Sequence, residues 1–258
     1  MSLFLGLALG FVSSFLGIGG GIFLVPLLPK IYDLTPYQAI VLSLTFVFIS
    51  VTINTVQYQF QKKIVWPLVL QMAPFIVIGG LIGSLIAKQV DGDYLRVFLV
   101  LFLILMSFSF LNTVLKLMAR NLESKNKKNY LANLPPHKLG VIAGLLSGFA
   151  GVGSGVFLNW LVLNNKNISP KEEAPTVNAM MIFVCLGVFI SAFLFDLNLL
   201  SEFYNKVGFD SFLLMIIGII GGSYVGKILN NKNLHQIRII SLTLITFTLA
   251  MTVLYELI

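Results

Sequence analysis

Apolar residues occur along the chain in eight long runs that short polar or charged stretches separate. Each run is about 20 residues or longer, which is the length of an α-helix that spans the hydrocarbon core of a bilayer. The pattern therefore predicts an all-α, polytopic membrane protein. The first run lacks the basic start of a secretory signal peptide, so we expect it to remain in the mature protein. The predicted segments are residues 2–29, 38–60, 64–87, 95–118, 138–164, 174–195, 208–229 and 236–257.

The two halves of the chain contain the same motifs in the same order. Three motifs recur: a glycine cluster, a proline-containing helix start, and a stretch of small residues. They lie at 17–21 and 151–155, at 35–43 and 169–178, and at 79–88 and 218–227. The chain is therefore predicted to consist of a first membrane repeat (1–118), a basic loop (119–137) and a second membrane repeat (138–258).

The paired glycine clusters interrupt the helical pattern in the middle of an apolar run. Glycines at successive or alternate positions weaken a helix, whereas glycines four residues apart line one face and let helices pack closely. An interrupted backbone is tolerated at membrane depth only beside protein or water, and paired interruptions in the two halves of a transporter indicate its binding site. The predicted substrate-lining residues are Gly17, Gly19, Gly20, Gly21, Gly151, Gly153, Ser154 and Gly155.

Ser43 and Asn178 occupy matching positions of the two repeats, one helix after each glycine cluster. Their side chains form hydrogen bonds without bearing charge, and the N-terminal end of a half-helix attracts anions. We predict that both residues bind substrate in an electropositive pocket that needs no Lys or Arg and that suits a small anion. The alternative is that they only bond neighbouring helices.

The basic residues distinguish two topologies. If all eight runs cross the membrane, the 17 Lys and Arg divide nine to eight between its sides. If the first and fifth runs are re-entrant hairpins, only Lys30, Lys88, Arg96 and Lys206 lie on one side, and the other thirteen share the side of the central loop. The positive-inside rule then favours inverted repeats, a cytoplasmic central loop and both termini outside. A single span with an unwound centre fits the length of each hairpin equally well.

Composition narrows the range of functions. The chain is 57% hydrophobic and only 10% charged, compared with roughly 25% charged residues in soluble domains. The net charge of +7 is spread over the loops without interleaved aromatic residues, so we expect no nucleic-acid partner. No metal-ligand set, nucleotide-binding loop or nucleophile elbow is present in the sequence. We therefore expect no metal, no cofactor, no catalytic residues and no enzymatic activity.

One stretch runs from Gly17 to Leu28, begins with Gly-Ile-Gly-Gly-Gly and contains Pro26; Thr35-Pro36 follow it. The same pattern recurs in degenerate form from Gly151 to Asn178. This arrangement resembles the sulfite exporter TauE/SafE family of membrane permeases, and the similarity covers nearly the whole chain. It implies a transporter of the bacterial inner membrane for small, often sulfur-containing anions of the sulfite, sulfonate or sulfoacetate type. The second half departs from the family pattern at Ser154 and at Asn159-Trp160.

The expected function is therefore movement of a small anion across the cell membrane, with export favoured over import. The expected partners are the anionic substrate and the lipid bilayer, and a homo-oligomer is compatible with this function. Two other classes stay open at this stage. One is a membrane-embedded enzyme, and the other is a scaffold without transport activity.

Overall fold

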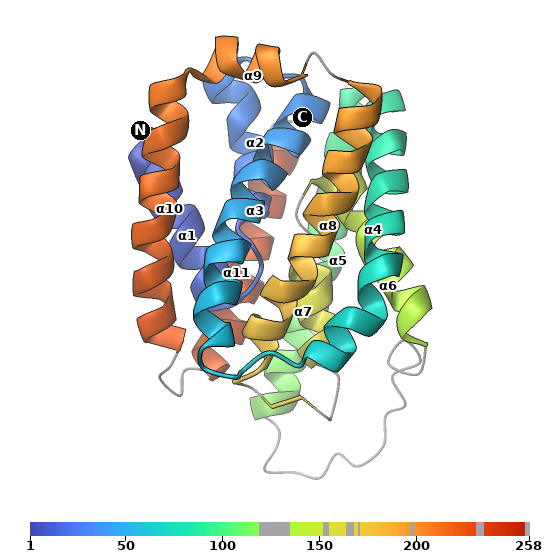
Figure 1. Ribbon diagram of the computed structural model, residues 1–258. Helices are drawn as coiled ribbons and strands as arrows, with labels where there is room; N and C mark the ends of the chain where they lie inside the picture. Colours follow the sequence, from blue (N-terminus) through green and yellow to red (C-terminus); the bar gives the residue numbers. More distant parts are fainter. Residues whose placement is uncertain are drawn as a thin grey trace.

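The computed structural model describes residues 1–118, 135–151, 155–163, 168–169, 171–196, 199–230 and 235–255, which form helices joined by turns (Figure 1). The helices of the first half are α1 (Ser2–Leu16), α2 (Gly21–Tyr32), α3 (Pro36–Gln59), α4 (Trp66–Gln89) and α5 (Gly92–Met118). Those of the second half are α6 (Pro136–Ala150), α7 (Gly155–Leu163), α8 (Glu173–Phe195), α9 (Leu199–Val207), α10 (Phe209–Asn230) and α11 (His235–Tyr255).

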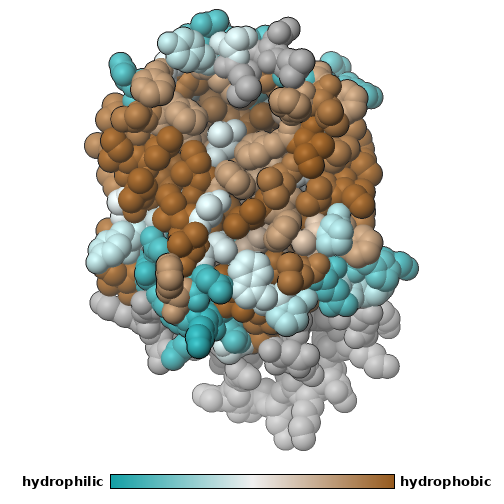
Figure 2. Space-filling model, in the orientation of Figure 1, coloured by the Kyte–Doolittle hydropathy of each residue, from teal (hydrophilic) through white to brown (hydrophobic). Residues whose placement is uncertain are grey.

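The prediction of an all-α, multi-pass membrane protein is confirmed. Within the part of the chain that the structure describes, four helices are long and apolar enough to cross a bilayer: α3, α4, α8 and the Phe209–Leu229 part of α10. Figure 2 shows a broad, mostly apolar band across the face in view, with hydrophilic residues above and below it. Such a band is what a bilayer core requires of the surface in contact with it.

The repeated proline motif marks the start of α3 and α8. At α3, the Thr35 hydroxyl accepts a bond from the Gln38 backbone N–H (3.3 Å), and the Gln38 side chain accepts one from the Thr35 N–H (2.9 Å). This is a capping box, with Pro36 in the first turn. Before α8, the Glu172 carboxylate accepts bonds from the Ser169 hydroxyl (2.7 Å) and backbone N–H (2.9 Å), which lower the pKa of Glu172.

Polar contacts define two ends of the molecule. At the α9 face, which holds α9, the turn after α2 and the end of α4, Lys206 Nζ donates to the Asp33 carbonyl (2.8 Å) and Lys88 pairs with Asp196 (3.0 Å). At the opposite face, which holds the α3–α4 turn at 60–65 and the start of α8, the Val65 N–H donates to Thr176 Oγ1 (3.2 Å). Helices α4 and α8 therefore run in the same direction, and α3 runs against α8.

Two helix pairs cross at glycines spaced four residues apart, as the sequence predicted for close packing. A Cβ added at Gly6 or Gly10 of α1 would collide with the backbone of α10, and one at Gly79 or Gly144 would collide with the backbone across the α4–α6 contact. Gly6 contacts Met215 and Gly10 contacts Ile219, so the contacts advance in the same direction along both helices and α1 and α10 are parallel. The contacts between α4 and α6 also advance in the same direction, so this pair is parallel too. Each pair joins a helix of one half to a helix of the other.

The segment predictions omitted α9, which lies across one end of the molecule (Figure 1). Its nine residues are too few to span a bilayer. Leu199 and Val207 are buried, whereas Glu202 and Lys206 point to polar partners on α3. An amphipathic helix at the edge of the apolar band leaves no long apolar run, so a search for such runs does not find it.

Candidate functional site

The first glycine cluster is the turn of a helical hairpin. Gly17, Gly19 and Gly20 have φ of 73°, 74° and 73°, a left-handed conformation that ends α1 and precedes α2. The Ser2 and Tyr32 hydroxyls, at the outer ends of the two helices, are 3.1 Å apart. The chain therefore enters at the α9 face, turns in the interior and returns to the same face. With 15 and 12 residues, neither helix is long enough to cross a bilayer alone.

The second glycine cluster begins in the same way. Gly151 ends α6 with φ 69°, and Gly155 begins α7. Gly153 and Ser154, which the sequence placed in the predicted site, lie outside the described residues. Figure 1 shows α6 and α7 with their outer ends toward the opposite face, so this pair approaches the interior from the other end of the molecule.

The two glycine clusters meet in the interior. A Cβ added at Gly155 would collide with the backbone of Ile18, and one at Gly21 would lie 3.0 Å from the Gly151 carbonyl oxygen. The buried Ser43 hydroxyl lies between them, 3.3 Å from the Gly21 carbonyl and 3.4 Å from that of Gly151. The start of α2 and the end of α6 therefore lie close together around a serine hydroxyl, and the start of α7 lies against Ile18 of the first turn.

Each turn also packs against the first long helix of the other half. A Cβ added at Gly17 would lie 2.7 Å from the Ala174 side chain of α8, and one at Gly151 would lie 2.7 Å from Ile40 of α3. Gly19 lies against Met181 and Val47, and Gly20 against Leu9. The turns are thus closely packed on both sides, and glycine is required for both conformation and space.

Asn178 lies in a buried polar cluster next to the end of α1. Its Oδ1 accepts bonds from Asn54 Nδ2 (3.3 Å) and from the Ser13 hydroxyl (3.5 Å), and its Nδ2 donates to the Ala174 carbonyl (2.7 Å). Asn54 Nδ2 also donates to Ser13 Oγ (3.0 Å). Sequence analysis singled out Asn178 but not Ser13 or Asn54. The cluster joins three separate helices, and only the fold brings these side chains together.

Asn159 of α7 completes the contact between the two clusters. Its Nδ2 donates to the Leu16 carbonyl, at the end of α1, over 2.7 Å. The Oδ1 atoms of Asn54 and Asn159 are buried and have no hydrogen-bond partner among the described residues. Since a side-chain amide presents either its oxygen or its NH₂ group after rotation, these residues have hydrogen-bonding capacity for a small polar guest.

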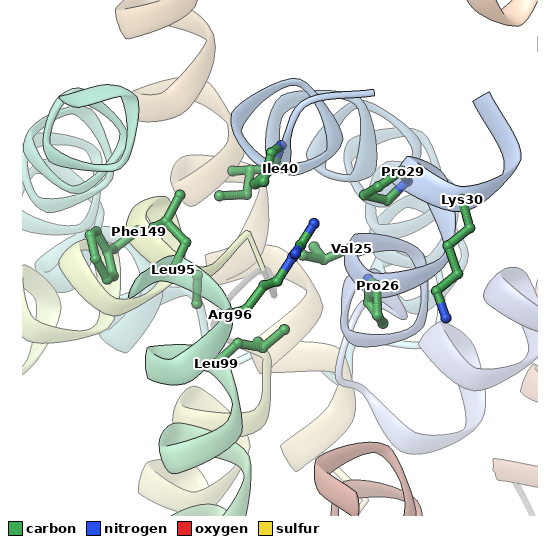
Figure 3. A pocket seen from close by; sticks show the side chains of 11 residues that line it. Val25, Pro26, Pro29, Lys30, Ile40, Leu95, Arg96, Leu99 and Phe149 are labelled. Atoms are coloured by element: carbon green, nitrogen blue, oxygen red, sulfur yellow. The ribbon is translucent and has the colours of Figure 1, made fainter. Parts of the chain in front are cut away.

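A cavity of about 340 Å³ leads from the α9 face toward the second turn (Figure 3). It ends at Phe149 and Ala150, next to Gly151, and its wall includes residues of α2, α3 and α5. Two cationic side chains, Lys30 and Arg96, line it, and Arg96 extends from α5 toward α2 in Figure 3. Sequence analysis expected a pocket without Lys or Arg. Sequence analysis used Lys30 and Arg96 only to assign the topology. Their separation along the chain gives no sign that they line one cavity.

The described residues contain no group of three or more metal-ligating side chains. The buried groups around the two turns are hydroxyls, amides and carbonyls. These groups can bind and release a small polar species by hydrogen bonding.

Comparison with known proteins identifies the family to which the chain belongs. The family model for the sulfite exporter TauE/SafE matches residues 2–252, nearly the whole chain. The chain belongs to the TauE/SafE family. It is 29% identical over 209 residues to a protein of Haemophilus influenzae named "Probable membrane transporter protein", with 76% of this chain and 74% of the relative covered.

Two more relatives of this TauE/SafE chain come from a Bacillus and a Methanocaldococcus species. The Bacillus subtilis protein YdhB is 23% identical over 230 residues, with 86% of each chain covered. The Methanocaldococcus jannaschii protein MJ0441 is 27% identical over 238 residues, with 88% of this chain and 84% of the relative covered. Both are named as probable membrane transporter proteins. No solved structure matches the chain. Family and relatives together indicate a membrane transporter.

Proposed function

We propose that this TauE/SafE protein is a permease, without enzymatic activity, that moves a small sulfur-containing anion of the sulfite, sulfonate or sulfoacetate type out of the cell across the bacterial inner membrane. The main support is the meeting of the two glycine turns: the start of α2 and the end of α6 lie at the Ser43 hydroxyl, and the start of α7 lies against Ile18 of the first turn. Backbone N–H groups at helix starts attract an anion, and neutral partners hold it weakly enough to release it. We assign substrate contact to both glycine clusters, Ser154, Ser43 and Asn178.

Export needs no coupling ion in this proposal. Moving one negative charge out of a cell that is negative inside releases about 2.3 kcal/mol per 100 mV. Among the described residues, the buried acid is Glu173, in the first turn of α8. The membrane potential is therefore a sufficient driving force.

We further propose that residues 1–118 and 138–258 are inverted repeats joined by a cytoplasmic loop at 119–137, with both termini outside. Corresponding helices α3 and α8 run in opposite directions, which supports this arrangement. Four basic residues lie at the α9 face: Lys30, Lys88, Arg96 and Lys206. At the opposite face, Lys63 lies near Lys171 and Lys227. Burial, together with the charges of these two lysines, lowers the pKa of Lys63. By the positive-inside rule, this distribution supports an α9 face that lies outside.

Flux measurements in proteoliposomes test the transport proposal. The purified full chain is reconstituted, and efflux of sulfite, sulfate, thiosulfate, sulfoacetate and a small carboxylate is followed under an imposed potential. We expect efflux of at least one sulfur-containing anion that accelerates when the lumen is made negative. Protein-free liposomes give the leak. Flux of none of these anions, or flux that ignores the potential and follows a pH gradient, would contradict the proposal.

Cysteine labelling tests the topology. Cys185, the only cysteine in the chain, is fully buried, so it contributes little background. The variants Lys30→Cys and Lys171→Cys are labelled in intact cells with a membrane-impermeant maleimide. We expect Lys30→Cys to react from outside and Lys171→Cys to react only after permeabilisation. Lys62→Cys is the control, because both topologies place it on the side of the central loop. Equal external labelling at positions 30 and 171 would mean that the hairpins are full crossings.

A further inference from the structure

The cavity at the α9 face has a polar mouth and an apolar floor. Lys30 and Arg96 are exposed at its mouth, whereas Ile40, Leu95, Leu99 and Ala150 are buried below them. Val25, Pro26 and Pro29 of α2 also line the cavity (Figure 3). The cavity is therefore amphipathic along its depth.

The mouth is suited to a single anionic group. Within the part of the chain that the structure describes, the Arg96 guanidinium forms an ion pair with Asp93 on the same helix, at 3.2 Å. The Asp93 side chain is 84% exposed, so solvent weakens this pair and it contributes little to holding the side chain in place. A guanidinium has five N–H donors in a fixed planar arrangement, which leaves several for a sulfonate or carboxylate. Lys30 adds a second positive charge.

The floor is larger and more apolar than an inorganic oxyanion requires. At about 340 Å³ the cavity lies at the lower end of the size range of pockets that hold organic molecules. Its buried residues offer hydrocarbon surface and no polar side chain to a bare sulfite ion, which would lose its hydration there without compensation. A hydrocarbon chain is favoured on the same surface.

We propose that this cavity binds an organic anion with a short hydrocarbon chain, whose charged group contacts Arg96 and Lys30 and whose chain lies on the apolar floor. The cavity ends beside Gly151, so such an anion would stand at the outer end of the path between the two turns. The inference rests on the proposed anion transport and refines it: the substrate is a chain-bearing sulfonate or carboxylate rather than an inorganic oxyanion.

Direct binding to the full chain in nanodiscs of zwitterionic lipid tests this inference without requiring transport. Isothermal titration with methanesulfonate, propanesulfonate, hexanesulfonate and sulfate gives the dissociation constants. We expect affinity to increase about fourfold per buried methylene and sulfate to bind weakest. The variant Arg96→Gln should lose about tenfold or more in affinity for every sulfonate, whereas Lys88→Gln should not change it. Lys88 is the matched control because it lies at the same face and pairs with Asp196.

A second variant tests the floor separately from the charge. Val25→Phe adds volume at a partly buried wall position and should weaken hexanesulfonate binding while leaving methanesulfonate binding unchanged. Affinities that ignore chain length, or that are equal in the wild type and Arg96→Gln, would overturn the inference. Sulfite efflux by a protein that binds no alkanesulfonate would overturn the inference and leave the proposed transport standing. Chain-length-dependent binding without any flux would support the cavity assignment and contradict the transport proposal.

Discussion

Replacing Gly151 with alanine should abolish anion flux and destabilise the protein by about 2–5 kcal/mol. Two effects add at this position. Alanine in a left-handed conformation costs about 1–2 kcal/mol, and Gly151 has φ 69°. The new Cβ would also lie 2.7 Å from Ile40 Cγ1 and 3.0 Å from its Cα. The turn must move, which would displace the Gly151 carbonyl from the Ser43 hydroxyl.

Gly208→Ala is the matched control for this variant. Gly208, before α10, has φ 74°, close to the φ of Gly151, but no atom lies within 4 Å of an added Cβ. It should therefore show only the backbone cost, with normal flux. Unfolding in mixed detergent and proteoliposome flux are measured for both variants. Equal effects of the two substitutions would show that the packing of the second turn against α3 is unimportant.

Replacing Asn178 with leucine should lower flux about ten- to hundredfold and reduce stability by about 1–3 kcal/mol. Leucine has a similar size but removes the acceptor for Asn54 Nδ2 and Ser13 Oγ. It also leaves the Ala174 carbonyl without the side-chain donor. A buried polar group without a partner disfavours the state that contains it. The polar cluster at the end of α1 should therefore open, and the first turn should lose its contact with α8.

Ser191→Ala is the control on the same helix. Ser191 of α8 is fully buried, and its hydroxyl has no hydrogen-bond partner among the described residues. Its loss removes an unsatisfied group, so stability should stay equal or rise slightly, with unchanged flux. The same proteoliposome and unfolding measurements apply. Wild-type flux in Asn178→Leu would remove Asn178 from the proposed substrate path.

Most of the helical architecture was predictable because the bilayer constrains it strongly. Hydrocarbon around the chain requires long apolar runs, and all eight predicted runs contain helices. The end of α1 was also predictable, because Gly17, Gly19 and Gly20 adopt the left-handed conformation that glycine tolerates best. Ser43 was identified through its repeat position, and it lies where the two turns meet.

Other features depend on contacts that hydropathy does not encode. Asn54 and Ser13 lie on different helices, and they join Asn178 only because α1, α3 and α8 converge. The cavity combines Lys30 of α2 with Arg96 of α5, 66 positions later in the chain. For α9, amphipathicity within nine residues produces no membrane-length signal. For the polar cluster and the cavity, the missing information is which helices become neighbours.

The parallel contact between α1 and α10 has a consequence for how the protein is made. In α1, Gly6 and Gly10 pack against the backbone of Met215 and Ile219 in α10. During synthesis about 200 residues separate these partners, so the first hairpin leaves the ribosome long before its packing surface exists. Assembly of the first half is therefore completed only after α10, in the second half of the chain, has been translated.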